Sequence, residues 1–185
     1  MLIDKFMPEY DVTEQHAILI DAPVSTVYAA LRTTDFGRPF LVKAMLALRA
    51  WPSALIHPKG LGKSNLHKKI KFDTFLQNGF AVLSEEPERE IVLGLVGRFW
   101  TLTGCLEETD AARFTTEYRP GLSKSAWNFT FEHSGRTTVV TTETRVQCTD
   151  HSSRRKFRNY WFFVRPFSAL LRQYMLKEMK RESEV

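Results

Sequence analysis

The chain has 185 residues, of which 43% are hydrophobic and 25% are charged, and its net charge is +5. This length and composition predict one globular domain over residues 1–185 and argue against a disordered chain. No stretch approaches the roughly 20 apolar residues that a membrane-spanning helix needs. Two cysteines far apart in the sequence make no disulfide framework, and residues 1–10 lack the apolar core of a secretory signal. A cytoplasmic location is therefore expected.

The first predicted elements are a strand and a helix joined by an Asp-Ala-Pro sequence. Residues 10–21 end in alternating or continuous apolar residues, which is typical of a strand. Pro23 lacks an N–H and restricts its own backbone, so it suits the first turn of a helix. The carboxylate of Asp21 is placed to cap that helix. Apolar residues then recur at helical spacing, namely Val24, Val27, Tyr28 and Leu31.

Residues 36–51 are apolar almost all round, and only Lys43 and Arg49 interrupt them after the first few positions. Such a helix is either buried against the body of the protein or serves as a lid or membrane-touching segment. The following loop contains the sequence GLGKS at residues 60–64, but a phosphate-binding loop would need glycine at the position of His57. A nucleotide site is therefore not expected.

The middle of the chain is predicted to form antiparallel strands. Residues 80–85 and 90–100 flank a turn with Pro87 near its tip, which indicates a hairpin. Residues 101–116 follow no clear pattern. The Pro120-Gly121 pair then indicates a type II turn before the next strand.

A second hairpin is predicted from residues 125–133 and 137–148, because Ser134-Gly135-Arg136 separates them. Glu143 and Arg145 fall on the outer face and are interpreted as a solvent-face pair, although a register error of one residue would turn both inward. The expected cross-strand pairs are Phe129 with Val140 and Trp127 with Thr142. The inner face is expected to carry Trp127, Phe129, Phe131, Val140, Thr142, Thr144 and Val146. The outer face is expected to carry Asn128, Thr130, Glu132, Thr141, Glu143 and Arg145.

Residues 150–184 predict a long helix that covers one face of the sheet and leaves the other face to solvent. Asp150 or Ser152 can cap its start, and Pro166 should kink the helix or split it in two. The segment holds nine basic and four acidic residues, which accounts for the whole net charge of the chain. Its apolar stripe consists of Phe157, Trp161, Val164, Ser168, Leu171, Met175 and Met179.

The sequence IDAPVSTVYAAL at residues 20–31, with its Val27-Tyr28 pair, resembles the start of the START-like superfamily (helix-grip, polyketide cyclase and lipid-transfer type, SRPBCC). The predicted order of elements is similar over nearly the whole chain. The resemblance implies an α+β fold: a curved antiparallel β-sheet wrapped around a long C-terminal α-helix, with two shorter helices after the first strand. It also implies a cavity for an apolar or amphipathic small molecule and no universal catalytic residues.

Ligand binding between the sheet and the last helix is the expected function. No catalytic motif and no cofactor pattern is found, and the five histidines lack the spacing of metal ligands. Arg98 could anchor a ligand carboxylate, or it could form a surface ion pair. The candidate ligand-binding residues are Arg98, Trp100, Trp127, Phe129, Thr142, Tyr160, Trp161 and Val164.

Two other functions remain open at this point. An enzyme of the cyclase, dehydratase or hydrolase kind would need an inward ionisable group, for which Glu117, His16 and Arg98 are the candidates. A module that contacts an anionic membrane would use residues 36–51 and the basic residues 154–158 at the start of the last helix. No nucleic-acid-binding motif is found. The sequence does not indicate which ligand is bound or the oligomeric state.

Overall fold

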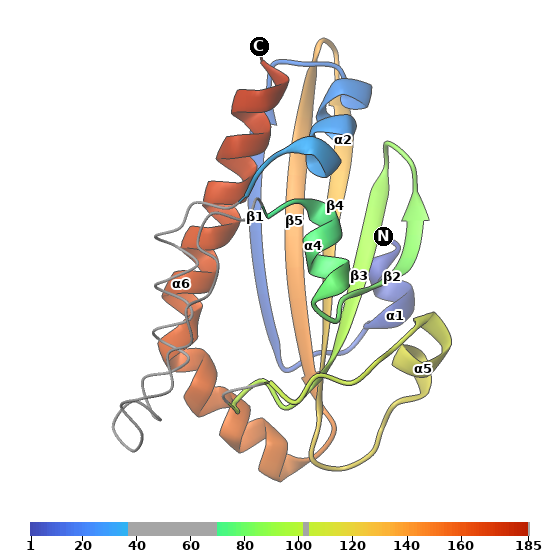
Figure 1. Cartoon of the computed structure of the whole chain (residues 1–185), viewed down its shortest axis with the longest axis vertical. Coiled ribbons are helices and arrows are strands. Elements are labelled where there is room, and N and C mark those ends of the chain that lie inside the picture. The colour runs from blue at the N-terminus through green and yellow to red at the C-terminus, as the bar shows by residue number, and fades with distance from the viewer. Residues whose placement is uncertain (37–69, 102–103, 185) are drawn as a thin grey trace.

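Five antiparallel strands form one curved sheet in the order β1-β5-β4-β3-β2 (Figure 1). The structure is a computed structural model that describes residues 1–36, 70–101 and 104–184. The predicted strands are confirmed, except that the third ends at Gly97 and does not reach Trp100. The strands are β1 (Val12–Ile20), β2 (Ala81–Glu86), β3 (Glu90–Gly97), β4 (Ser123–Ser134) and β5 (Thr137–Cys148).

One long helix lies along the inner face of this sheet, which confirms the predicted α+β architecture (Figure 1). Phe36 is buried, and the rest of the apolar segment 36–51 and the loop at 60–64 lie outside the described residues. No helix in the described ranges is long and apolar enough to cross a bilayer. The helices are α1 (Ile3–Phe6), α2 (Val24–Thr33), α4 (Phe72–Gln77), α5 (Ala111–Thr116) and α6 (His151–Ser183).

The junction between β1 and α2 differs from the prediction in how the helix begins. Pro23 itself is the N-cap residue, with an extended backbone and no side-chain hydrogen bond. The capping role expected of Asp21 is wrong, because a side-chain cap is supplied by the N-cap residue, two positions further on. Instead the backbone N–H of Asp21 donates to Glu184 Oε1 at 2.8 Å. The junction is therefore fastened to the far end of the chain, just beyond α6.

The β4–β5 hairpin turns one residue later than predicted, at Gly135-Arg136. The pairing consequently shifts by two residues, so that Phe129 lies opposite Thr142 and Trp127 opposite Thr144. Because side chains alternate with a period of two, a shift of two leaves every residue on its predicted face. The inner and outer sets of side chains are thus confirmed, although the individual pairs are not.

The outer face of the sheet is covered over β3, β4 and the second half of β5, so the prediction of a solvent-exposed face is wrong there, whereas the outward residues of β1 are exposed. Glu143 and Arg145 are each only 7% exposed. Arg145 Nε donates to Glu143 Oε1 at 2.7 Å, and its Nη1 donates to Asp4 Oδ1 at 2.8 Å. The predicted pair exists, but the N-terminal segment with α1 lies over it, since Arg145 donates to Asp4 and to the Met7 carbonyl, and α5 covers β2 and β3 beside it. The apolar residues of this second layer are Leu2, Ile3, Met7, Leu83, Val92, Val96, Phe114, Leu122 and Ala126.

Helix α6 begins and ends as predicted and is one continuous helix. Asp150 Oδ1 accepts from the Ser153 backbone N–H at 2.9 Å, which confirms the cap. This bond and one from the Gly121 N–H hold the pKa of Asp150 well below its usual range. The helix runs unbroken through Pro166, so it is not split in two. Pro166 is exposed, on the side of the helix away from the sheet.

Candidate functional site

Aromatic rings dominate the layer between the inner face of the sheet and the helices, with Trp127 at its centre. The Trp127 ring is 3% exposed and meets Phe75, Phe80 and Phe129 at centroid distances of 5.3, 5.7 and 5.0 Å. Rings in such edge-on and tilted contacts are stabilised by both area and geometry. The layer therefore offers an apolar surface with the Trp127 indole fixed in the middle.

A hydrogen bond holds the Trp127 ring in its orientation. Its Nε1–H donates to Thr142 Oγ1 at 2.7 Å, and the Thr142 hydroxyl in turn donates to the backbone carbonyl of Asn128 at 2.8 Å. Thr142 is only 1% exposed. Each buried donor of this chain of bonds has an acceptor, which gives the indole a single stable position.

Arg172, on α6, brings a cation into this aromatic layer. Its guanidinium carbon lies 3.9 Å from the centroid of the Trp127 ring. Its Nη1 is buried and has no hydrogen-bond partner within the described part of the chain. Burial lowers the pKa of Arg172 to about 9, and the carboxylate of Glu14 opposes that fall. The residue as a whole is half-buried, so at neutral pH it is a cation whose inner Nη1 has no hydrogen-bond partner among the described residues.

An acid and an imidazole from β1 complete the polar part of the site. Glu14 and His16 share the inward parity of the strand, and Glu14 Oε1 lies 3.1 Å from His16 Nε2. The other carboxylate oxygen of Glu14 is buried without a hydrogen-bond partner among the described residues. Glu14 pairs with Thr144, which pairs with Trp127, so all three lie in one row across the sheet. The layer between the sheet and α6 therefore holds a buried donor and a buried acceptor that have no hydrogen-bond partner among the described residues.

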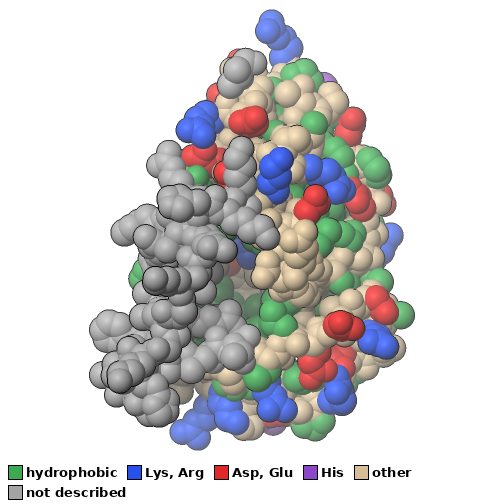
Figure 2. All heavy atoms as spheres, viewed as in Figure 1, with side chains coloured by type: hydrophobic (Ala, Val, Ile, Leu, Met, Phe, Trp, Pro, Cys, Tyr) green, Lys and Arg blue, Asp and Glu red, His purple; other side chains and the backbone are tan. Residues whose placement is uncertain are grey.

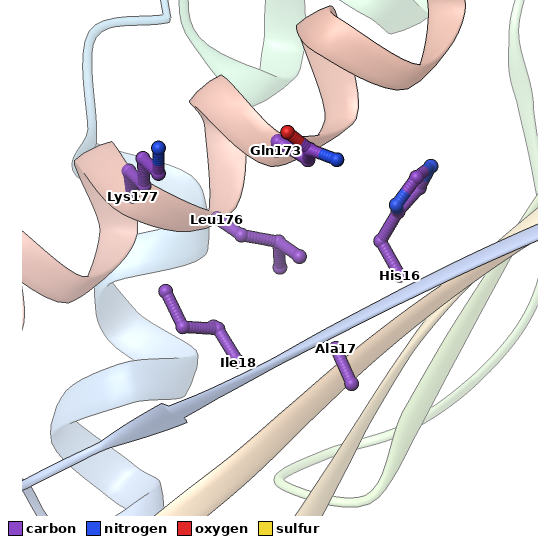
Figure 3. A pocket seen from close by; sticks show the side chains of 6 residues that line it. All are labelled: His16, Ala17, Ile18, Gln173, Leu176 and Lys177. Carbon is purple, nitrogen blue, oxygen red and sulfur yellow. The ribbon is translucent and has the colours of Figure 1, made fainter.

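A cleft at the edge of the sheet reaches His16 from outside. It lies between β1 and α6 and has a volume of about 250 Å³. Figure 3 shows His16 and Ile18 pointing from β1 toward α6, whereas Ala17 points away. β1 is the edge strand of the sheet, and within residues 1–36, 70–101 and 104–184 no further strand pairs with it on this side. The residues that line the cleft are His16, Ala17, Ile18, Gln173, Leu176 and Lys177.

The structure brings together only some of the candidate ligand-binding residues. Trp127, Phe129 and Thr142 lie side by side on the inner face. Val164 is half-buried on α6. Trp100, Tyr160 and Trp161 gather elsewhere, around the buried ring of Phe157 near the start of α6.

Arg98 is exposed and stands in a turn, where its N–H donates to the Gly104 carbonyl at 2.7 Å. Arg98 and Trp100 were expected within the strand over residues 90–100, and this is wrong because the chain turns after Gly97. A Cβ on Gly97 would lie 2.7 Å from the Gly104 oxygen, so the two backbones approach closely there.

Two residues of the site, Arg172 and Glu14, are absent from the sequence-based candidates. Arg172 follows Ser168 by four residues and precedes Met175 by three, so helical spacing places it on the apolar stripe. Glu14 has the same parity as Ile18 along β1. The sequence spacing therefore places both residues on buried faces, but charged residues are ordinarily expected at the surface.

Glu117, a candidate for enzyme chemistry, lies far from this layer. It borders an exposed cleft of about 380 Å³ beside Glu107 and Arg119. Hydrogen bonds from Arg119 lower the pKa of Glu117. Its carboxylate is thus bound in a surface ion pair and does not point inward. In the described ranges no three His, Cys, Asp or Glu side chains gather as metal ligands.

Comparison with known proteins finds similarity only among solved structures. No protein-family model and no curated protein matches the sequence. CalU16 from Micromonospora echinospora is 13% identical with a TM-score of 0.32, over 92% of this chain and 85% of that one. TTHA0849 from Thermus thermophilus is 12% identical with a TM-score of 0.30, over 93% and 97%. The di-domain ARO/CYC BexL from the BE-7585A biosynthetic pathway is 14% identical with a TM-score of 0.36, over 98% and 53%.

Proposed function

We propose that the chain binds an amphipathic small molecule between the inner face of the sheet and α6, with an acidic group of the ligand on Arg172. The observation that carries this proposal is the Arg172 guanidinium over Trp127, whose buried Nη1 has no partner among the described residues. A buried charge is costly unless it is paired and hydrogen-bonded. An anionic ligand group would supply both, and a guanidinium suits a carboxylate because it can donate two parallel bonds.

The rings around Trp127 would bind the apolar part of the ligand. Burial of apolar area contributes about 25 cal/mol per Å², so an alkyl or ring system gains affinity from contact with Phe129 and its neighbours. The few polar groups would set the orientation. Tyr160, Trp161 and Val164 lie further along α6 and would extend the apolar surface for a longer ligand. Arg98, being exposed in its turn, has no part in this proposal.

A fluorescent long-chain fatty acid and its methyl ester test the proposal. Charge-assisted hydrogen bonds contribute about 1.5–3 kcal/mol, so the acid should bind roughly 10- to 100-fold more tightly than the ester. Arg172→Gln should remove this difference while the ester still binds. Arg165→Gln is the matched control, because Arg165 is on the same helix but exposed. Equal affinity of the wild type for acid and ester, or no displaceable binding, would defeat the proposal.

A second candidate is an enzyme that uses the same site, and the contact between His16 and Glu14 favours it. A carboxylate beside an imidazole can orient the ring and stabilise its protonated form, as acid–base catalysis requires. The cleft beside β1 gives solvent and substrate a route to His16. Saturable hydrolysis of a p-nitrophenyl ester that is lost in His16→Gln would support this candidate. A rate that His16→Gln leaves unchanged would count against it.

A further inference from the structure

The outer face of α6 exposes two neighbouring phenylalanines. Phe162 is 77% exposed and Phe163 is 64% exposed, and their ring centroids lie 5.3 Å apart. Leu170, which is 53% exposed, lies seven residues after Phe163 and therefore on the same side of the helix. Single exposed apolar residues are ordinary, but adjacent large ones on one face indicate a contact surface.

Basic residues flank these rings along α6, and this part of the helix contains no acidic residue. From residue 151 to residue 177 the helix carries seven Lys or Arg and no Asp or Glu. Arg158 lies one turn before Phe162, and Arg165 lies about one turn after it. Arg155, Lys156, Arg158 and Arg165 are all exposed, and none of them has an ion-pair partner in the described part of the chain.

Helix stability does not account for these cations. Arg155 and Arg158 lie three residues apart on α6, and like charges at this spacing destabilise a helix. A set of residues that is unfavourable in the free protein is more readily explained by a negatively charged partner.

We propose that the basic aromatic face of α6 docks on the surface of an anionic phospholipid bilayer. This face is defined by Arg155, Lys156, Arg158, Phe162, Phe163, Arg165 and Leu170. Figure 2 shows Lys and Arg side chains gathered along the lower edge of the molecule, where Figure 1 places the first half of α6. A helix that binds at the bilayer interface has this composition, with Phe or Leu entering the headgroup boundary and Lys or Arg pairing with lipid phosphates.

The docking surface is separate from the proposed ligand site. The buried side of α6, with Phe157, Met175 and Met179, packs against the sheet, and the exposed rings are on the opposite side. The helix can therefore lie flat on a bilayer without giving up its contacts in the core. This inference does not depend on what the interior binds.

Vesicle flotation with the full chain tests the inference. The wild type should float with vesicles of phosphatidylcholine and phosphatidylglycerol and remain unbound with phosphatidylcholine alone. Binding should weaken with added salt, because screening acts on exposed charges. Arg158→Gln/Arg165→Gln should weaken binding by roughly 25-fold, since each cation near an anionic surface contributes about a fivefold gain. Phe162→Ser/Phe163→Ser should abolish flotation even at low salt.

Matched controls distinguish binding through this face of α6 from a general effect of net charge or of exposed apolar area. Arg89→Gln/Arg136→Gln removes the same charge from other exposed positions, and Leu19→Ser removes an apolar side chain that is 53% exposed on β1. Both controls should float like the wild type. The inference is overturned if the α6 variants float as well as the controls, or if the wild type binds neither kind of vesicle. A wild-type dimer that Phe162→Ser/Phe163→Ser converts to a monomer, without vesicle binding, would assign the face to a second copy and overturn it too.

Discussion

The guanidinium carbon of Arg172 lies 3.9 Å from the centroid of the Trp127 ring, so a cation of α6 stacks on the central indole of the sheet. Such a contact is favourable, but it does not replace the hydrogen bonds that a guanidinium makes in water. The pKa of Arg172, which burial lowers to about 9, indicates that its environment disfavours the charged form on balance. The position of Arg172 thus lowers the stability of the protein when no ligand is bound.

Arg172→Met should raise the free energy of unfolding by about 1–3 kcal/mol at neutral pH, since an apolar side chain of similar length replaces a poorly paired buried ion. The same change should weaken binding of the fatty acid. Chemical denaturation and ligand titration measure the two effects. Arg165→Met, at an exposed position, should change stability by less than about 0.5 kcal/mol. A large loss of stability in Arg172→Met would instead mean that the cation holds the layer together.

The same residue predicts a pH dependence. Arg172 titrates at about 9 in the folded protein, below its ordinary value of 12.5. Between these values the unfolded chain binds the proton that the folded chain has lost, so the contribution of Arg172 to stability increases as pH rises through this window. Denaturation of the wild type and of Arg172→Met at pH 8 and at pH 10 measures it. The stability advantage of Arg172→Met should shrink at the higher pH, and an advantage that grows would contradict the assignment.

Thr142→Val should cost about 1–3 kcal/mol, because it leaves the buried Nε1–H of Trp127 without an acceptor. The neighbouring Thr141 faces the other side of the sheet and makes no such bond to the indole. Thr141→Val is therefore the matched control and should cost much less. Urea denaturation followed by circular dichroism compares them. Equal losses in the two variants would show that the bond to Trp127 contributes little.

The alternation of side chains carried most of the fold prediction. Trp127 and Thr142 fall on one face in any register that keeps parity, so an error of two residues in the hairpin does not affect their placement. The apolar stripe of α6 could also be predicted, because its spacing of three and four residues indicates a helix and cannot be mistaken for the alternation of a strand. Both patterns arise because one face of each element is buried in the core, and these buried faces determine how the sheet and α6 pack.

Features that depend on long-range contacts could not be predicted in this way. Helix α1 has only four residues and therefore no periodicity, yet it covers part of the outer face, where its Asp4 accepts a hydrogen bond from the buried Arg145. Its anchor is Glu90, 87 to 88 positions away in the sequence. Arg172 lay on a recognisable stripe, but charge is ordinarily a sign of exposure. Arg172 departs from this tendency, and the proposed ligand site depends on it.

Glu90→Gln should destabilise the protein by about 1.5–3 kcal/mol and loosen α1. The Glu90 carboxylate is 6% exposed and accepts from the N–H groups of Leu2 and Ile3, at 2.6 and 3.1 Å. It also accepts from Asn128 Nδ2 at 2.7 Å. Bonds to a charged acceptor contribute more than neutral ones, and an amide cannot accept all three equally. Denaturation and limited proteolysis of the N-terminal segment provide the measurements.

The control for this change is Glu86→Gln, in the same β2–β3 hairpin. Glu86 forms an exposed ion pair with Arg89 at 2.9 Å. Exposed pairs of this kind contribute little, so the control should cost less than about 1 kcal/mol and leave the proteolysis pattern unchanged. If Glu90→Gln behaves like Glu86→Gln, the carboxylate is not what anchors α1.

The two cysteines should react very differently with a thiol reagent. Cys105 is exposed, whereas Cys148 is 5% exposed, and burial, aided by the Asp11 carboxylate, raises the pKa of Cys148 to about 12. At pH 8 the native protein should therefore show one fast-reacting thiol, and two in denaturant, because the thiolate is the reactive form. Cys105→Ser should leave no fast thiol. A fast reaction that survives in Cys105→Ser would place Cys148 at the surface, which its packing against Phe157 of α6 argues against.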